Sequence, residues 1–204
     1  MRVFHAISNK TMSEGAKMPL VKAQDIARRF MHYLEPFVEK MSVAGSVRRE
    51  CDFCHDVEVV CVPRDEFSMG LAFPEGFKGM TTNGARLKKF VYNDSGIHIE
   101  LYITTREDYG RILAIRTGSS AFSHINLALR WNRLGWAGTE DGLRRKSECI
   151  HKSTWKISHE YKNCPTLPPA FETEEDFFAF LGIEWVHPKS RSWVSKHQEI
   201  NYKP

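Results

Sequence analysis

Two carboxylates stand one residue apart, at Asp56 and Glu58, where a run of β-branched residues begins. Side chains at this spacing project from the same face of a β-strand. Neighbouring carboxylates repel each other, so the pair favours a bound cation. Hard divalent cations such as Mg²⁺ prefer oxygen ligands and are usually held by one or two carboxylates together with substrate phosphates. The pair therefore indicates a metal-dependent phosphoryl or nucleotidyl transfer site.

Helical and strand patterns surround this pair. Apolar residues recur at helical spacing from Pro19 to a bend or an end at Pro36. Residues 42–44 predict a short strand that leads into a turn at Gly45-Ser46. The β-branched run over 57–62 is typical of a buried strand. The acids thus lie at the start of a strand that follows a helix, a strand and a turn.

A further acid, Glu100, lies in the next regular segment. Residues 64–84 are rich in Gly, Pro and Phe and predict a loop or an insertion without defined structure. Residues 87–92 and 97–104 then predict two strands joined by a turn at 93–96. Apolar and polar residues alternate along the second strand, and this places Glu100 on its polar face.

The composition shifts after Thr104, which marks the predicted boundary between two lobes. The second lobe is predicted to contain, in order, a turn at 118–120, a helix over 121–134, a hairpin within the basic segment 144–169 and a helix over 177–181. Thr173 and the acids after it cap the last helix, and Gly182 stops it.

The composition is that of an ordinary globular protein. The chain has 204 residues, of which 42% are hydrophobic and 26% charged, enough for one substantial core or two small ones. Its formal charge of +4 fits a nucleic-acid partner without requiring one. No apolar run approaches the ~20 residues of a membrane span, and the N-terminus lacks a signal-peptide pattern. Five cysteines, an odd count, favour reduced thiols in a cytosol-like compartment.

Three separated segments carry a resemblance to a known family. They are Gly45-Ser46-Val47-Arg48-Arg49 leading to Asp56-Val57-Glu58, Ile97-His98-Ile99-Glu100-Leu101-Tyr102, and Arg116-Thr117-Gly118-Ser119 backed by residues 175–188. In this order they resemble the nucleotidyltransferase superfamily, and within it the X family of DNA polymerases. The layout is similar to the small viral members that have only a palm and a C-terminal nucleotide-binding lobe.

The resemblance implies an α+β fold, α/β in the loose sense. A catalytic palm with a mixed, mostly antiparallel sheet would occupy residues 19–105, and a small α+β thumb lobe that binds nucleotide and template would occupy 106–191. An N-terminal arm over 1–18 and a polar tail over 192–204 would flank them. No segment resembles the lyase domain or the helix-hairpin-helix elements of larger family members.

The implied activity is that of a DNA-directed DNA polymerase. It would transfer dNMP from a dNTP to a primer 3′-hydroxyl, filling short gaps in DNA repair. The partners would be dNTP and a primer-template or gapped duplex, with no membrane partner. The protein would be a monomer in the cytoplasm, as a viral or phage protein acting in the host cell.

The family's metal ligands correspond to Asp56, Glu58 and Glu100, which would hold two Mg²⁺ or Mn²⁺ ions. The first pair would bridge both ions, and Glu100 would bind the ion at the primer terminus and help to deprotonate the 3′-hydroxyl. Two of these three positions are Glu where the family usually has Asp.

The resemblance also implies nucleotide and DNA contacts. The predicted nucleotide-binding residues are Gly45, Ser46, Arg49, Cys54, His55, Ile115, Arg116, Thr117, Gly118 and Ser119. The predicted DNA-binding residues are Ser123, Asn126, Arg130 and Arg133, on a helix that carries an extra residue relative to the family. The family has aromatic residues at the positions of Ile115 and Arg116. A solvated loop pair remains the alternative for Arg48 and Arg49, and a solvated helix face for Arg130 and Arg133.

Other interpretations stay open. The same chemistry could serve a template-independent nucleotidyltransferase acting on nucleic-acid ends, a small molecule or a protein. A binding module that has lost catalysis would lack an acid, and none is missing. Residues 51–55 spell a haem c attachment pattern, and cysteines and histidines over 51–55 and 149–164 could ligate zinc, but ordinary thiols are favoured. A redox pair of Cys51 and Cys54, and a phosphate or primer contact by His98, are further alternatives.

Overall fold

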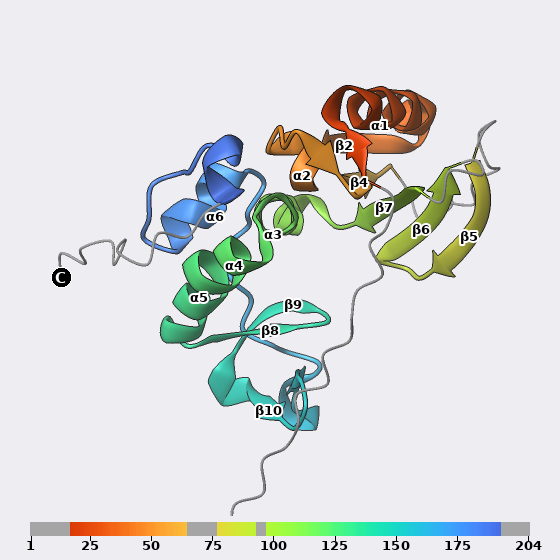
Figure 1. The fold of residues 1–204 in the computed structure, drawn as a ribbon. Coiled ribbons are helices and arrows are strands. Elements are labelled where there is room, and N and C mark those ends of the chain that lie inside the picture. The colour runs from red at the N-terminus through yellow and green to blue at the C-terminus, as the bar shows by residue number, and fades with distance from the viewer. Residues whose placement is uncertain (1–16, 65–76, 93–96, 193–204) are drawn as a thin grey trace, which may run out of the picture.

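A mixed sheet forms the centre of the computed structural model, which describes residues 17–64, 77–92 and 97–192. The sheet has five strands in the order β2-β4-β7-β6-β5, and only β4 and β7 run parallel (Figure 1). The strands are β2 (Val38–Val43), β4 (Asp56–Pro63), β5 (Phe77–Asn83), β6 (Leu87–Tyr92) and β7 (Ile97–Ile103). Helices and mixed sheets together confirm an α+β fold.

Helix α1 (Leu20–Leu34) covers one face of this sheet and α3 (Tyr109–Thr117) lies on the other (Figure 1). Alternate residues of β4 separate accordingly. Val57, Val59 and Cys61 pack in the core beneath α1. Val60 and Val62 pack with Tyr102, Tyr109 and Leu113 on the side of α3. Because side chains alternate along a strand, Asp56 and Glu58 share the α3 side of the sheet.

Residues 109–192 contain a second hydrophobic cluster built from aromatic side chains, among them Trp136, Phe171, Phe177 and Phe178. Its regular elements are α4 (Ser120–Phe122), a π-helical turn (Ser123–Ala128), α5 (Leu129–Arg133), β8 (Trp136–Thr139), β9 (Gly142–Arg145), β10 (Cys149–His151), β11 (Trp155–Ile157) and α6 (Glu174–Phe180). The pairs β8–β9 and β10–β11 are antiparallel hairpins. The predicted capping is confirmed, because Thr173 and Asp176 form a capping box on α6.

Short elements complete the architecture. They are β1 (Met18–Pro19), α2 (Gly45–Arg48), β3 (Phe53–Cys54) and 3₁₀ turns at Glu35–Phe37, Arg106–Asp108, Lys146–Glu148, His159–Tyr161 and Pro188–Ser192. The predicted helix after Pro19, the strand pair 87–92 and 97–104, and the hairpin within 144–169 are confirmed.

One structural prediction was wrong. Residues 77–83, placed in a loop or insertion, form the edge strand β5, which pairs with β6. An edge strand is fixed by backbone hydrogen bonds to a single neighbour, so it needs no apolar alternation that a sequence pattern could reveal. The register also shifts twice along this pair, which further weakens a period of two. The predicted turn at 93–96, residues 65–76, most of the arm and most of the tail lie outside the described residues.

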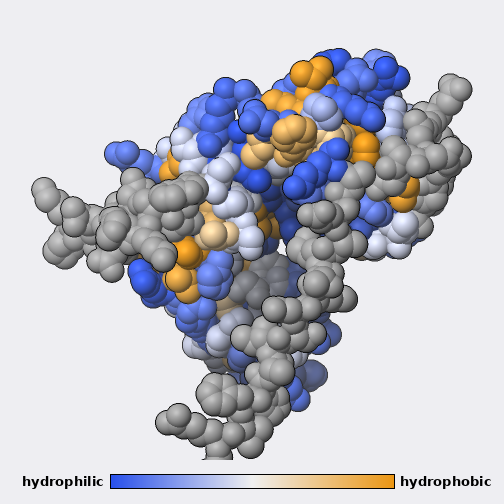
Figure 2. Space-filling view, viewed as in Figure 1, coloured by the Kyte–Doolittle hydropathy of each residue, from blue (hydrophilic) through white to orange (hydrophobic). Residues whose placement is uncertain are grey.

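Hydrophilic residues cover most of the face seen in Figure 2, and apolar residues form small separate patches. Exposed large apolar side chains are correspondingly scattered over several elements, including Val21, Phe53, Ile125 and Ile150. Within the described ranges, no helix has the length and apolarity needed to cross a membrane.

Candidate active site

The three predicted acids lie on one face of the sheet, on two adjacent strands. Glu58 of β4 is the parallel ladder partner of Glu100 of β7, and Asp56 is the partner of His98. All three carboxylate residues are partly exposed, whereas Val57, Val59, Ile99 and Leu101 between and beside them are buried on the opposite face. The strand pairing therefore brings together the acids that sequence spacing could only assign to separate segments.

Repulsion and burial act on the first two acids. Burial, followed by the charge of Glu100, raises the pKa of the Asp56 carboxyl. Burial, followed by the charge of Asp56, raises the pKa of Glu58 to about 7, although Arg116 and Arg49 act in the opposite direction. No side-chain hydrogen bond or ion pair joins either carboxylate to another described residue. Among the described residues no cation contacts these two acids directly, and carboxyls whose pKa is raised in this way are candidates for an active or metal-binding site.

Glu100 is held differently. The Lys89 ammonium donates to its Oε1 at 2.5 Å, and the Tyr102 hydroxyl donates to its Oε2. Burial alone would raise the pKa of Glu100, but these hydrogen bonds hold it below its usual value. The guanidinium of Arg116 lies 3.9 Å from the centroid of the Tyr102 ring. Arg116 therefore contacts the acid site through Tyr102, a residue that the sequence did not single out.

The Gly45 turn touches the acid pair directly. Gly45 has a φ of +59°, and a Cβ built on it would lie 1.9 Å from Oε2 of Glu58. The backbone N–H of Ala44 also donates to the carbonyl of Glu58 at 2.8 Å. Only glycine permits both this backbone conformation and this approach. The predicted turn is one helical turn, α2, and it is packed against the metal-site candidate as the sequence order suggested.

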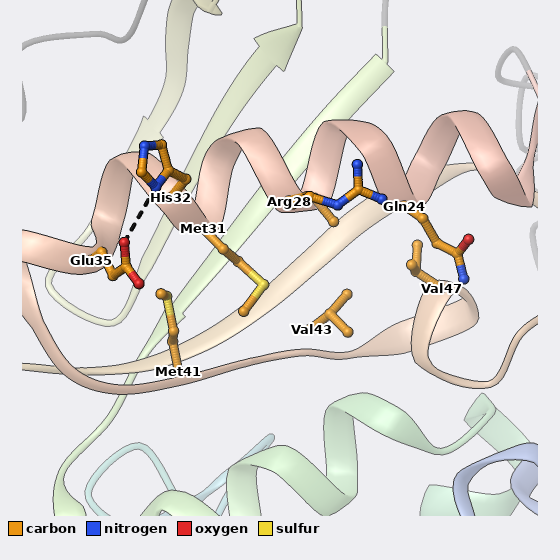
Figure 3. A pocket seen from close by; sticks show the side chains of 9 residues that line it. Gln24, Arg28, Met31, His32, Glu35, Met41, Val43 and Val47 are labelled. Carbon is orange, nitrogen blue, oxygen red and sulfur yellow. Dashed lines mark hydrogen bonds and ion pairs between the residues drawn. The ribbon is translucent and has the colours of Figure 1, made fainter.

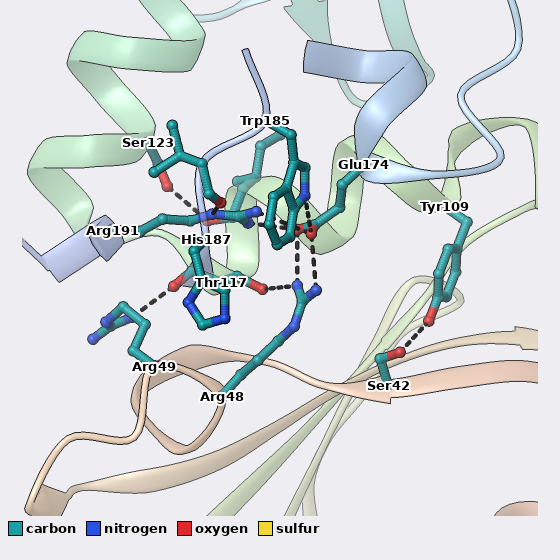
Figure 4. Close-up of polar contacts among 12 residues, drawn as sticks. Ser42, Arg48, Arg49, Tyr109, Thr117, Ser123, Glu174, Trp185, His187 and Arg191 are labelled. Atoms are coloured by element: carbon teal, nitrogen blue, oxygen red, sulfur yellow. Dashed lines mark hydrogen bonds and ion pairs between the residues drawn. The ribbon is translucent and has the colours of Figure 1, made fainter. Parts of the chain in front are cut away.

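The interpretation of Arg48 and Arg49 as a solvated pair was wrong. Arg48 donates to both carboxylate oxygens of Glu174 at 2.8 Å and to Oγ1 of Thr117 at 2.6 Å. Arg49 donates from Nη1 to the backbone carbonyl of Thr117 at 2.8 Å (Figure 4). The Nε of Arg49 is buried with no partner among the described residues. Both arginines therefore join α2 to the end of α3, because Thr117 and Glu174 are buried acceptors within their reach.

Glu174 is a polar hub that sequence reasoning missed. Besides Arg48, Arg191 donates to its two oxygens at 2.5 and 3.0 Å, and Trp185 Nε1 donates at 3.2 Å (Figure 4). Burial would raise the pKa of Glu174, but hydrogen bonds from Arg191 and then Arg48 hold it below its usual value. An acid in the first turn of a helix usually serves as an exposed cap. Its position there gave no signal that this one is only 4% exposed.

The predicted thumb residues lie at the junction of α3 and α4. Ile115, Arg116 and Thr117 end α3, Gly118 follows, and Ser119 caps α4 by accepting from the Phe122 N–H. The Ser123 hydroxyl donates to the carbonyl of Ile115 at 2.7 Å. Both serine hydroxyls thus have local partners here, and their roles toward nucleotide and DNA stay predictions.

The remaining predicted residues are distributed around this junction and the acid strand. Ser46 lies in α2, Cys54 is buried in β3, and His55 is exposed just before β4. Asn126 lies in the π-helical turn, while Arg130 and Arg133 lie in α5. A π turn bonds each residue one position further along than an α-helix does, so it takes up one additional residue. This turn is a physical counterpart of the extra residue noted in the sequence.

Two cavities lie away from the acids. A groove of about 600 Å³ runs between α1 and β2, and its lining combines apolar side chains such as Met31 and Met41 with polar ones such as Arg28 and Glu35 (Figure 3). A cavity of about 210 Å³ adjoins the Glu174 hub and is lined by Arg48, Tyr109 and Trp185 among others (Figure 4). None of the three predicted metal ligands lines either cavity.

The donor chemistry of the acid face suits a hard divalent cation. Within ranges 17–64, 77–92 and 97–192, no group of three or more His, Cys, Asp or Glu side chains is arranged to hold a metal ion. The acids nevertheless present oxygen donors only, and burial, followed by the charge of a neighbouring acid, raises the pKa of both Asp56 and Glu58. One or two carboxylates are the usual protein share of a Mg²⁺ site. Asp56 and Glu58 therefore fit such an ion, with Glu100 engaged by Lys89 and Tyr102.

Comparison with known proteins adds no relative: no protein-family model matches the chain, and no curated protein sequence matches it.

Proposed function

We propose that this chain is a nucleotidyltransferase that extends a DNA primer on a template, in the manner of the X family of DNA polymerases. The observation that supports this most is the contact between Gly45 and the Glu58 carboxylate on a strand that pairs Glu58 with Glu100. The resemblance assigns the Gly-Ser turn to triphosphate binding and the acids to metal binding. The contact between Gly45 and Glu58 brings these two parts together.

Asp56, Glu58 and Glu100 would hold Mg²⁺ or Mn²⁺. When bound, the ions would offset the charge of the triphosphate and favour loss of the 3′-hydroxyl proton at neutral pH. In the reaction, the 3′-oxygen forms a bond to the α-phosphorus of the dNTP, the bond from that phosphorus to the bridging oxygen breaks, pyrophosphate leaves and a proton is released. The finer assignment to DNA and to a template rests on the resemblance.

The chain's own residues would contribute positioning and charge. Arg49 lies beside the Gly45 turn with a buried, unpartnered Nε, and Arg116 lies over Tyr102 next to Glu100. Both cations lie near enough to Glu58 to lower its pKa. This supports a role for Arg49 and Arg116 in offsetting the negative charge of a bound triphosphate. Arg130 and Arg133 on α5 would hold DNA by phosphate contacts, so binding would weaken steeply with salt.

Extension of a gapped duplex tests the proposal. Four duplexes that differ only in the templating base would each be incubated with Mg²⁺ and one dNTP at a time. We expect incorporation of the complementary dNTP. Incorporation that ignores the templating base would overturn the templated polymerase and favour the template-independent nucleotidyltransferase. No incorporation of any dNTP with Mg²⁺ or Mn²⁺ would overturn primer extension altogether.

A further inference from the structure

An ion pair lies within the acid-bearing face of the sheet. Lys89 of β6 is the direct ladder partner of Glu100 of β7, and their charged atoms are 2.5 Å apart. The two side chains are 34% and 15% exposed, so the pair is partly shielded from water. The Tyr102 hydroxyl donates to the other oxygen of the same carboxylate. Each oxygen of Glu100 therefore already has a donor.

The three acids therefore differ in their hydrogen-bond partners. Asp56 and Glu58 have no hydrogen-bonding side chain among the described residues, whereas both oxygens of Glu100 accept hydrogen bonds. The Lys89 charge also acts on Asp56, whose pKa it lowers. A single ammonium thus partly neutralises the site from its β6 side, and the Arg116 guanidinium does so from α3.

We propose that Lys89 is the resident counter-ion of the acid site and that its charge, in contact with Glu100, weakens the binding of a divalent cation by the acids. This inference rests on the proposed function, because it takes the three acids to be the metal ligands. A carboxylate oxygen can coordinate a cation while it accepts a hydrogen bond, but the Lys89 ammonium already offsets one negative charge of the site and repels a divalent cation bound beside it. Free metal then binds more weakly than three unpaired acids would allow.

Tyr102 acts as a positioning residue for Glu100. Its hydroxyl donates to Oε2, whereas Lys89 donates to Oε1, so one hydrogen bond still orients Glu100 in a chain without the Lys89 ammonium. The stacking of Arg116 on the Tyr102 ring fixes that ring in turn. Tyr102 therefore keeps the carboxylate position of Glu100 independent of the Lys89 contact.

Binding of Mn²⁺ alone, followed by the loss of its free-ion electron paramagnetic resonance signal, tests the proposal without nucleotide, DNA or turnover. We expect Lys89→Met to bind Mn²⁺ about ten-fold more tightly than the wild-type chain, because one competing charge at contact distance is removed. Lys88→Met is the matched control: it removes the same charge from the next residue of β6, where Lys88 donates to Asn83. It should change the affinity less than about two-fold, since its charge does not contact the acids.

A double variant locates the effect. Lys89→Met should raise the Mn²⁺ affinity of a Glu100→Gln chain by a smaller factor than it raises that of the wild-type chain. Equal Mn²⁺ affinity of the wild-type chain and Lys89→Met, or equal gains from Lys88→Met and Lys89→Met, would overturn the role of Lys89 and leave the proposed function standing. Absence of Mn²⁺ binding by the wild-type chain and both lysine variants would instead contradict the metal site on which the proposed function depends.

Discussion

Glu58 and Glu174 are both largely buried acids, yet their surroundings are opposite. Glu174 is bound by two arginines and a tryptophan, and its pKa is lowered. Glu58 has Asp56 and Glu100 as its acidic neighbours, and its pKa is raised to about 7. A buried charge with donors on every side stabilises the junction it joins, whereas one left beside other acids is costly unless a ligand supplies the missing charge. The contrast separates the acid that joins α2, α6 and Arg191 from the acids proposed to carry the chemistry.

The largest effect is expected from Glu174→Gln. This change leaves the Arg48 and Arg191 guanidiniums without their carboxylate, and Arg191 is fully buried. Loss of one partner of a buried ion pair costs about 3–5 kcal/mol of unfolding free energy, measurable by urea denaturation. Glu175→Gln, at the exposed next position of α6, is the control and should cost less than about 0.5 kcal/mol. Equal losses would remove the distinction drawn between Glu174 and Glu58.

Glu58→Gln should change the unfolding free energy in the opposite direction, by stabilising the folded protein. The folded-state pKa of Glu58, about 7, exceeds its ordinary value of 4.5, so folding becomes less favourable as pH rises from 4.5 through 7. In metal-free buffer at pH 8 the variant should therefore be more stable than the wild-type chain, by up to about 3 kcal/mol.

The gain should vanish below pH 4.5, where Glu58 is protonated in both the folded and unfolded states. Thermal unfolding at pH 4 and pH 8 measures the difference, with the exposed Glu140→Gln as a control that should show no such pH dependence. A loss of stability at pH 8 would mean that Glu58 is already compensated in the metal-free protein.

A smaller difference is expected between two glycine variants, one of which touches Glu58. Gly45→Ala combines a left-handed backbone conformation with a collision against the Glu58 carboxylate, and Gly135→Ala provides a matched control. Gly135 has a φ of +80° and nothing within 4 Å of the added Cβ, so its variant reports backbone strain alone. Strain costs about 1–3 kcal/mol at each position, and Gly45→Ala should lose about 1 kcal/mol more by forcing Glu58 to move. Equal losses would show that the contact with Glu58 is unimportant.

The smallest effect is expected for an acid that is paired but exposed. Asp141 accepts from Arg86 at 2.8 Å, between the β8–β9 hairpin and β6, and both side chains are at least half exposed. Such pairs contribute about 0–1 kcal/mol, so Asp141→Asn should change the unfolding free energy by less than about 0.5 kcal/mol in urea. A loss as large as that of Glu174→Gln would show that pairing alone, without burial, determines the cost.

The sequence predicted local features well because they depend on neighbouring residues. The helix after Pro19, the capped helix α6 and the β6–β7 pair each follow from spacing or capping within a few positions. The acids Asp56 and Glu58 were found by their alternation on one strand. Only the family resemblance grouped Glu100 with these two acids, because no local sequence pattern indicates which residues of two distant strands lie opposite each other.

The interactions that surround the acids could not be predicted. Glu174 reaches Arg48 across 126 positions of the chain, and Lys89 reaches Glu100 through the pairing of two strands. The partners of Arg48 and Arg49 depend on how α3 and α6 pack on the sheet, which no residue pattern encodes. The edge strand β5 was missed for a related reason, because one backbone neighbour defines it.

Release of pyrophosphate during primer extension, compared between the wild-type chain and Asp56→Asn/Glu58→Gln, tests the central claim most directly. Both proteins would be assayed with gapped DNA, complementary dNTP and Mg²⁺, after circular dichroism has shown equal folding. We predict pyrophosphate release in proportion to nucleotide incorporated by the wild-type chain, and background release by a variant that is at least as stable. Full activity in the variant would contradict the assignment of these acids as the catalytic site.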